Sequence, residues 1–297
     1  MILKANKELK QKDFKNEKEL QNFFENNIEA ILGYKFIDTE FVVGDFRIDS
    51  LAFDEESKSF RIIEYKNVKN HSLVDQGYTY LKLMLERKAD FVLQYNIKTN
   101  SSLTTQDIDW SQSRIIFVAP IYTAYQLNAT DFKNIPVDLV KLTRYEDDII
   151  EIDFIKKTSN VKVQDIQMES IQNDVNKEII VYTEEDHLSK VSDNIKRVYE
   201  ELKTRILELD DIDVEAKKLY IAFKGIRNIA DIELHKNKLK IYINMKRGSL
   251  NDPLKLTKDI SGIGHWGNGD YCIIIDKKDD IDNVIPLIKQ SLKVNKK

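Results

Sequence analysis

The sequence predicts a mixed α/β domain, a sheet flanked by helices, followed by a smaller α+β domain. The length of 297 residues favours two domains over one. A β-hairpin pattern occupies residues 44–66, with helical and strand patterns around it. From residue 156 to 190 the chain is polar and lacks glycine and proline, and a second helix-and-strand pattern follows. We therefore expect an N-terminal domain at 1–155, a connector at 156–190 and a C-terminal domain at 191–297.

The spacing of apolar residues predicts the elements of the N-terminal domain. Residues 17–32 carry apolar side chains three and four positions apart, which indicates an amphipathic helix, and Gly33 suits its C-terminal cap. A strand at 34–43 precedes the hairpin, and a second helix is expected at 73–88. Short apolar runs predict further strands at 91–95, 114–119, 137–142 and 149–155, with a helical turn at 121–127.

The C-terminal domain is expected to begin with a helix at 191–209 and to end with a helix at 279–292. Strands are predicted between them at 220–224, 229–235, 238–245 and 271–275. The glycine-rich loop at 261–271 lacks the Lys-Ser/Thr pair of a phosphate-binding loop, so we assign it no nucleotide. Several cationic and polar residues of this domain, with one tryptophan, have a composition suited to nucleic-acid contact: Lys224, Arg227, Asn228, Lys246, Arg247 and Trp266. The simpler interpretation is a solvated basic edge and a tryptophan in the core.

Three charged side chains interrupt the apolar pattern of the hairpin. Asp49 lies in the first strand, and Glu64 and Lys66 lie in the second. A turn centred between Glu56 and Ser57 would place Asp49 opposite Glu64. Because side chains alternate between the two faces of a strand, all three would then project from the same side.

Two adjacent carboxylates repel each other unless a cation lies between them. Oxygen ligands of this kind favour Mg²⁺, with Mn²⁺ as a second candidate, and the carbonyl of Tyr65 is placed to join Asp49 and Glu64 as a ligand. Lys66 would position or deprotonate a metal-bound water, which is the chemistry of phosphodiester hydrolysis. From these residues alone, a solvated hairpin face is an equally good interpretation.

The pattern of Asp49, fourteen intervening residues and then Glu64-Tyr65-Lys66 resembles the signature of the PD-(D/E)xK nuclease superfamily. Ile48 stands where that signature usually has proline. The resemblance covers roughly residues 14–96 and implies a restriction-endonuclease-like sheet. It also implies Asp49 and Glu64 as metal ligands, with Lys66 assisting the attacking water.

The flanking segments resemble the NucS- and RecB-like branches of that superfamily. Glu19, near the start of the first predicted helix, matches an accessory acid that binds the metal through water. Asp75-Gln76 with Tyr80 resembles the helix that follows the catalytic strand. Gln76 and Tyr80 are four residues apart and share a helix face. The resemblance implies that Gln76 contacts the scissile phosphate or orients a metal ligand.

The C-terminal part resembles a domain of unknown function over about residues 192–295. The resemblance depends on the segment at 220–233, the Asp252-Pro253 pair and the loop at 265–271. That domain accompanies predicted nucleases and proteins related to modification-dependent restriction factors. It therefore implies a context of restriction or defence and no chemistry of its own.

Composition limits the partners and the location of the chain. The 46 basic and 50 acidic residues give a net charge of −4, so any nucleic-acid surface must be a local patch. Cys272 is the single cysteine, which excludes an internal disulfide and a zinc–cysteine cluster. No apolar run approaches the ~20 residues that cross a membrane, and the first residues lack the apolar core of a signal peptide. We expect a cytoplasmic protein without a membrane partner.

The leading prediction is a Mg²⁺-dependent endonuclease that hydrolyses phosphodiester bonds in DNA. The main alternative is a non-catalytic nucleic-acid-binding module that keeps the nuclease fold, which the intact Asp49, Glu64 and Lys66 set disfavours. A protein-interaction adaptor is a third interpretation. The resemblance favours DNA over RNA as the partner, and the sequence leaves open whether the chain acts as a monomer or a homodimer.

Overall fold

The structure, a computed structural model, describes residues 2–66, 73–132, 135–158, 170–265 and 267–296. The chain forms two compact units, residues 1–181 and residues 182–297. A mixed sheet flanked by helices makes up the first unit, and a sheet with helices on one face makes up the second. The predicted fold class is confirmed.

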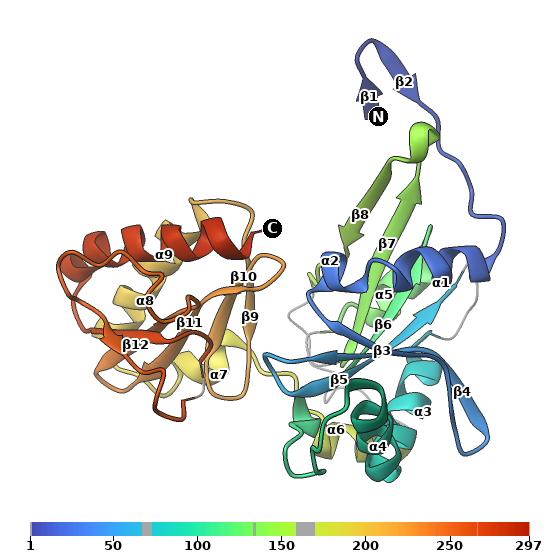
Figure 1. Cartoon of the computed structure of the whole chain (residues 1–297), viewed down its shortest axis with the longest axis horizontal. Coiled ribbons are helices and arrows are strands. Elements are labelled where there is room, and N and C mark those ends of the chain that lie inside the picture. Colours follow the sequence, from blue (N-terminus) through green and yellow to red (C-terminus); the bar gives the residue numbers. More distant parts are fainter. Residues whose placement is uncertain (1, 67–72, 133–134, 159–169, 266, 297) are drawn as a thin grey trace. The chain divides into compact units, whose positions relative to one another are not determined.

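The sheet of the N-terminal unit has the strand order β3-β4-β5-β6-β7-β8 (Figure 1). Strands β3, β4 and β5 are antiparallel, β5, β6 and β7 are parallel, and β8 returns antiparallel to β7. Their bounds are β3 (Lys35–Val43), β4 (Phe46–Asp54), β5 (Ser59–Tyr65), β6 (Arg114–Ala119), β7 (Val137–Arg144) and β8 (Ile150–Phe154).

Helices cover both faces of this sheet because its strands place apolar residues on both sides. Along β5, Ile62 packs into one core while Ile63 packs into the other. One face is covered by α1 (Glu17–Glu25) and α2 (Ile28–Leu32). The other is covered mainly by α3 (Leu73–Glu86), α4 (Lys88–Thr99), α5 (Ala124–Thr130) and α6 (Ser170–Glu178).

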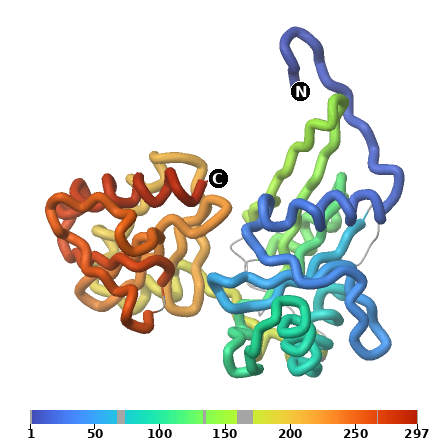
Figure 2. The backbone as a smooth tube through the Cα atoms, viewed as in Figure 1, coloured from blue at the N-terminus to red at the C-terminus, as the bar shows by residue number. Residues whose placement is uncertain are grey.

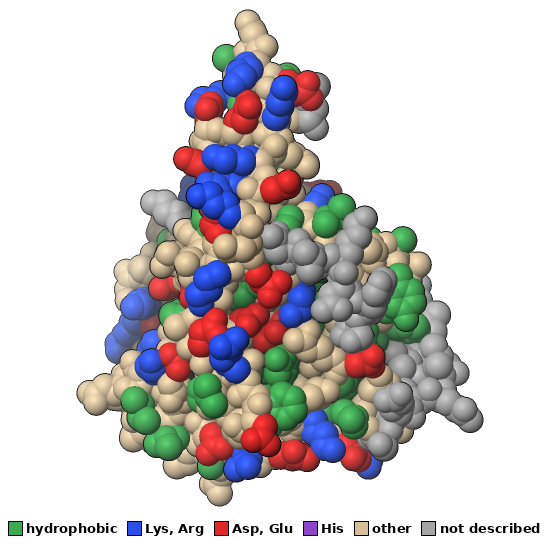
Figure 3. All heavy atoms as spheres, turned by 90° about the vertical axis from the view of Figure 1, so that its right-hand side faces the viewer, with side chains coloured by type: hydrophobic (Ala, Val, Ile, Leu, Met, Phe, Trp, Pro, Cys, Tyr) green, Lys and Arg blue, Asp and Glu red, His purple; other side chains and the backbone are tan. Residues whose placement is uncertain are grey.

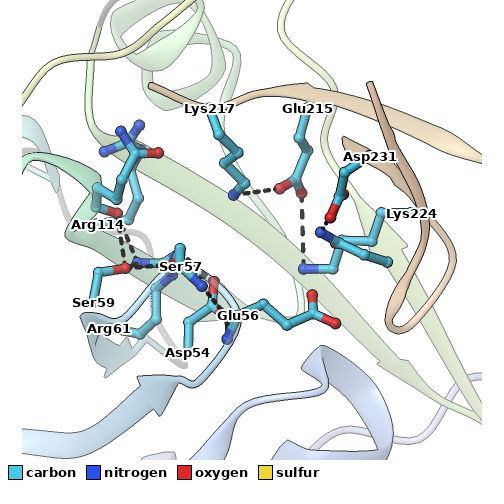
Figure 4. Close-up of polar contacts among 12 residues, drawn as sticks. Asp54, Glu56, Ser57, Ser59, Arg61, Arg114, Glu215, Lys217, Lys224 and Asp231 are labelled. Atoms are coloured by element: carbon cyan, nitrogen blue, oxygen red, sulfur yellow. Dashed lines mark hydrogen bonds and ion pairs between the residues drawn. The ribbon is translucent and has the colours of Figure 1, made fainter. Parts of the chain in front are cut away.

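A buried polar cluster fixes the turn of the β4–β5 hairpin (Figure 4). Asp54 accepts hydrogen bonds from the backbone N–H groups of Glu56 (3.0 Å) and Ser57 (3.2 Å). Arg61 holds the same carboxylate at 2.8 Å and also donates to the carbonyl of Gln112 at 2.7 Å. The turn therefore lies at the predicted centre. The predicted register is confirmed by the pairs from Ser50 with Ile63 to Asp54 with Ser59.

Two predictions about the N-terminal unit are wrong. Residues 91–95 lie inside helix α4, where Phe91, Val92 and Tyr95 face the core at helical spacing and Leu93 is 59% exposed. The helix expected at 17–32 is broken into α1 and α2. There the Asn27 side chain donates to the carbonyl of Phe23, and such local hydrogen bonds compete with a continuous helix. Gly33 ends α2 as predicted, with φ of 72°.

The segment predicted as a connector, residues 156–190, is not a separate connector where the structure describes it. Helix α6 belongs to the N-terminal unit, because Val175 and Ile179 are buried in the core beneath α3. Tyr78 of α3 also donates its hydroxyl proton to the side chain of Asn176, at 3.1 Å. The boundary between the two units falls at residues 181 and 182. Residues 159–169 of this segment lie outside the described residues.

The chain begins with a short hairpin of β1 (Ile2–Lys4) and β2 (Lys7–Leu9). It lies beside the turn that joins β7 and β8 (Figure 2). Lys4 pairs with Asp147 and Lys7 with Glu146, both at 3.0 Å. Within the described ranges, no helix is both long enough and apolar enough to span a lipid bilayer.

The sheet of the C-terminal unit has the strand order β13-β14-β12-β11-β10-β9. Helices α8 and α9 pack on one face through a core that includes Ile195, Leu202 and Ile288. The bounds are α7 (Glu184–Leu188), α8 (Asp193–Leu207), β9 (Asp213–Ala216), β10 (Ile221–Lys224), β11 (Asn228–His235), β12 (Lys238–Ile243), β13 (Lys258–Asp259), β14 (Tyr271–Ile275) and α9 (Ile281–Asn295).

Candidate active site

The carboxylates of Asp49 and Glu64 meet where the β4–β5 ladder ends. Beyond the Ser50–Ile63 pair, side chains take over the hydrogen bonding between the two strands. The backbone N–H of Asp49 donates to Glu64 Oε1 at 3.1 Å. The backbone N–H of Tyr65 donates to Asp49 Oδ2 at 3.1 Å. The confirmed register thus holds two acidic side chains side by side at the open end of the hairpin.

Two further predicted residues reach the same place. Lys66 Nζ lies 3.6 Å from Glu64 Oε2, and the lysine side chain is 12% exposed. Gln76, in the first turn of α3, donates from Nε2 to Glu64 Oε2 at 3.0 Å. Tyr80 lies one helical turn further and donates to the carbonyl of Arg47 at 3.2 Å. The structure therefore brings together Asp49, Glu64, Lys66 and Gln76.

Burial and nearby negative charges raise the pKa values of both acids. Burial, followed by the negative charge of Asp49, raises the pKa of Glu64 to about 8. Burial also raises the pKa of Asp49, against the opposing effects of the Tyr65 N–H and the Lys66 ammonium. The charges of Glu17 and Glu40 raise the Asp49 pKa further. Without a cation, two ionised carboxylates are therefore unfavourable here at neutral pH.

Glu64→Gln is expected to stabilise the metal-free protein at alkaline pH. The folded-state pKa of Glu64 is about 8 and the unfolded value is 4.5, so folding retains a proton that the unfolded chain loses. Wild-type stability should therefore fall as pH rises from about 4.5 to about 8, and glutamine removes this loss. We expect the unfolding free energy of the variant to exceed that of wild type by on the order of 4 kcal/mol at pH 8.

The measurement is urea unfolding with chelator present, at pH 5 and at pH 8. At pH 5 the two proteins should differ much less, because wild-type Glu64 is then protonated in the folded state. A difference that does not change with pH would show that Glu64 titrates normally.

The donor set fits a hard divalent cation. In the chain as far as it is described, no three His, Cys, Asp or Glu side chains are close enough to hold one ion together. A metal here would therefore use Asp49, Glu64, a backbone carbonyl and solvent or substrate oxygens, which is the usual ligand set of Mg²⁺. The N–H and C=O of a strand residue point to the same neighbouring strand, so the Tyr65 carbonyl lies on the Asp49 side.

The structure does not bring Glu19 to this group. Its Oε1 pairs with Arg144 at 2.9 Å, and its Oε2 accepts from the Lys15 N–H at 2.6 Å. Helix geometry explains the difference, because residues two positions apart lie on nearly opposite sides of a helix. Glu17 lies on the side toward Asp49, and its charge contributes to the raised Asp49 pKa. Of the two acids in the first turn of α1, Glu17 is therefore the one whose charge acts on the predicted ligand Asp49.

Sequence analysis also missed the residues of α1 that support the site. Gln21 is 4% exposed and donates to the carbonyl of Asp49 at 2.9 Å and to Glu25 Oε1 at 2.9 Å. Glu25 accepts in turn from the Ser50 hydroxyl at 2.6 Å, and that hydroxyl lies 3.0 Å from the Tyr65 hydroxyl. The four-residue spacing of Glu17, Gln21 and Glu25 was the available signal.

The basic and glycine-rich residues of the C-terminal unit have structural partners. Asn228 is buried and donates to Asp231 at 2.8 Å, and Asp231 also accepts from the Asn268 backbone and side chain. Arg247 pairs with Asp259 at 2.9 Å. Trp266 lies outside the described residues. The glycine-rich loop is thus anchored on Asp231, a buried residue of β11.

Comparison with known proteins identifies the C-terminal unit. Residues 184–295 match the model of a family described as a domain of unknown function (DUF5655), which confirms the resemblance predicted for about residues 192–295. The structure titled "Structure of EndoMS-dsDNA2 complex" aligns over 41% of this chain with 20% identity and a TM-score of 0.27. The chain spans 42% of the length of that structure's chain.

A relative matches nearly the whole length of the chain. It is a protein of Haemophilus influenzae (strain ATCC 51907 / DSM 11121 / KW20 / Rd), named "Uncharacterized protein". The two are 47% identical over 289 residues, which cover 96% of each. The chain, whose own residues 184–295 match DUF5655, therefore belongs to the same family as this H. influenzae protein.

Proposed function

We propose that the chain is a metal-dependent endonuclease that hydrolyses phosphodiester bonds in DNA. The observation that carries the proposal is the meeting of Asp49, Glu64 and Lys66 at the open end of one hairpin, with Gln76 fixed on Glu64. The resemblance of this motif to the PD-(D/E)xK signature supports the same chemistry and favours DNA as the substrate. A site built of paired acids and a cation suits phosphoryl transfer, where positioning and charge stabilisation dominate.

Each residue has a separate task in this proposal. Asp49, Glu64 and the Tyr65 carbonyl would hold Mg²⁺, or Mn²⁺, which when bound polarises a phosphoryl oxygen and activates water. Lys66 would place its ammonium beside the attacking water and offset the charge that develops on the phosphate. Gln76 keeps the Glu64 carboxylate in one orientation through its hydrogen bond to Oε2. Gln21 holds β4 at Asp49 through the Asp49 carbonyl.

The charge around the site favours catalysis over simple nucleic-acid binding. Asp49 and Glu64 are joined by the negative charge of Glu17, whereas Glu40 is paired with Lys18 and Arg47. A phosphate backbone approaching this group meets repulsion unless a divalent cation offsets it. A module that only binds nucleic acid gains nothing from such a group of acids, whereas a metal-dependent hydrolase requires them.

A cleavage assay on the full chain tests the proposal. Supercoiled plasmid, single-stranded DNA and single-stranded RNA are incubated with Mg²⁺, with Mn²⁺ or with chelator, and Asp49→Asn serves as the inactive control. We expect metal-dependent nicking or linearisation of DNA by wild type alone. If the protein binds DNA but does not cleave it with any metal, the nuclease proposal is wrong and the chain is a nucleic-acid-binding module.

Divalent ions are expected to raise the melting temperature of wild type, and Asp49→Asn should lose most of that increase. A ligand that binds only the folded state stabilises it by about 2.7 kcal/mol at a concentration one hundred times its dissociation constant. Asparagine keeps the shape of Asp49 but removes one of the two charges that hold the cation. Asp153→Asn, a matched change on strand β8, should keep the full increase. An equal response of wild type and Asp49→Asn to Mg²⁺ would place the ion elsewhere.

A further inference from the structure

A carboxylate beside the site is held between two cations from different elements. Glu40 Oε1 pairs with Lys18 Nζ at 2.9 Å, and Glu40 Oε2 pairs with Arg47 Nε at 2.8 Å. Lys18 belongs to α1, Arg47 to β4 and Glu40 to β3. The side chains of Lys18 and Arg47 are 53% and 67% exposed. Two solvent-accessible cations thus converge on one anionic group.

This ion-paired group adjoins the proposed metal ligands. Thr39 and Phe41 pair with Ser50 and Ile48 of β4, so Asp49 is the residue opposite Glu40. On the other side, Lys18 Nζ contacts Gln21 Oε1 at 3.0 Å, and Gln21 holds the Asp49 carbonyl. Figure 3, which shows the face at the right-hand side of Figure 1, has acidic and basic side chains intermingled. A phosphate bound by Lys18 and Arg47 would therefore lie next to the phosphate that is cut.

The backbone at Glu40 is strained within a strand. Its φ is 51°, in the left-handed region that residues other than glycine rarely adopt. Strain of this kind costs on the order of 1 kcal/mol or more and is concentrated at functional sites. A glycine would adopt this conformation without strain. The carboxylate of Glu40 is thus presented to Lys18 and Arg47 at a cost in stability.

We propose that Lys18 and Arg47 bind a backbone phosphate of the nucleic-acid substrate, and that Glu40 occupies their subsite until the substrate arrives. The inference rests on the proposed function and names the residues that position the strand. Carboxylate and phosphate make the same kind of hydrogen bonds with lysine and arginine. Exposed ion pairs contribute only about 0–1 kcal/mol each, so a phosphate with its greater charge can displace Glu40 at little cost.

The test is a double-mutant cycle on DNA affinity. Anisotropy of a labelled duplex is measured at low salt, with Ca²⁺ in place of Mg²⁺ and again with chelator. All variants carry Lys66→Ala, so that cleavage does not interfere. Glu40→Gln should tighten binding about three- to tenfold, because it frees both cations. Lys18→Ala and Arg47→Ala should each weaken binding, and Arg47→Ala should lower the salt slope by about one.

The cycle shows whether Glu40→Gln tightens DNA binding by freeing Lys18 and Arg47 or only by removing a negative charge. In the Lys18→Ala/Arg47→Ala background, Glu40→Gln should no longer tighten binding. Glu55→Gln removes a charge at the opposite end of the hairpin, where Glu55 pairs with Lys35 at 3.3 Å, and should leave affinity unchanged. Glu40→Gly, which also relieves the backbone strain, should tighten binding like Glu40→Gln. Equal tightening with and without the two cations would overturn the subsite.

The DNA-affinity cycle and the cleavage assay can succeed or fail independently of each other. A positive cycle in a protein that never cuts would overturn the nuclease and keep the phosphate subsite. If the protein cuts DNA with metal but Glu40→Gln changes DNA affinity equally with and without Lys18 and Arg47, the nuclease proposal stands and the subsite proposal is overturned. If none of the variants binds DNA, the subsite proposal fails as well.

Discussion

Lys66→Ala is expected to slow DNA cleavage by about 10²–10³-fold while leaving DNA affinity nearly unchanged. The Lys66 ammonium lies 3.6 Å from Glu64 Oε2, inside the group that would surround the scissile phosphate. A cation in that position matters most when charge develops on the phosphate in the transition state. Its loss should therefore raise the activation free energy of cleavage more than it weakens DNA binding. One phosphate contact among several is a small part of a salt-dependent affinity.

Metal occupancy must be kept constant in this comparison. The Lys66 charge opposes the rise in the pKa of Glu64, so alanine shifts that pKa further upward and weakens metal binding near neutral pH. Single-turnover rates are therefore taken at saturating Mg²⁺ and again at a higher pH. Lys82→Ala, a matched change on α3 whose lysine pairs with Glu86 on the helix surface, serves as the control. A Lys66→Ala protein that cuts at the wild-type rate would remove Lys66 from the mechanism.

The hairpin and its register were predictable because local chemistry specifies them. Asp54 can satisfy two turn N–H groups only if the turn is centred at Glu56 and Ser57, and that centre fixes every pair up to Ser50 and Ile63. Strand alternation then places Asp49 and Glu64 side by side without information from elsewhere in the chain. The convergence of Asp49, Glu64 and Lys66 therefore follows from one short segment.

The rest of the site depends on contacts between distant segments. The orientation of α1 is set by how Leu20 and Phe24 pack on the sheet. The sequence analysis named Glu19, whereas Glu17 is the α1 acid whose charge acts on Asp49. Residues 91–95 form a short apolar run that fits a strand or a buried helix equally well, and packing against Phe53 and Phe60 settles it as helix. Helix α6 was not predicted because its sequence is polar, although Val175 within it and Ile179 directly after it are buried.

Arg61→Ala is expected to lower the unfolding free energy of the N-terminal unit by about 3–5 kcal/mol. The side chains of Arg61 and Asp54 are only 3% and 5% exposed and pair at 2.8 Å. Removing the guanidinium leaves the Asp54 carboxylate buried without its cation. It also removes donors to the carbonyl of Gln112 and the hydroxyl of Ser59. Loss of one partner of a buried pair is more destabilising than loss of both, because an uncompensated charge remains.

Urea unfolding followed by the fluorescence of Trp110 measures the effect. Trp110 stacks on Phe60, the neighbour of Arg61, and a Trp266→Phe background leaves it as the single tryptophan. Lys35→Ala, which breaks the exposed pair with Glu55 near the same turn, should cost less than about 1 kcal/mol. Adding Asp54→Asn to Arg61→Ala should restore part of the loss, since the stranded charge is then gone. If Arg61→Ala costs no more than Lys35→Ala, the buried pair does not hold the turn, and the register that aligns Asp49 with Glu64 is maintained by strand packing alone.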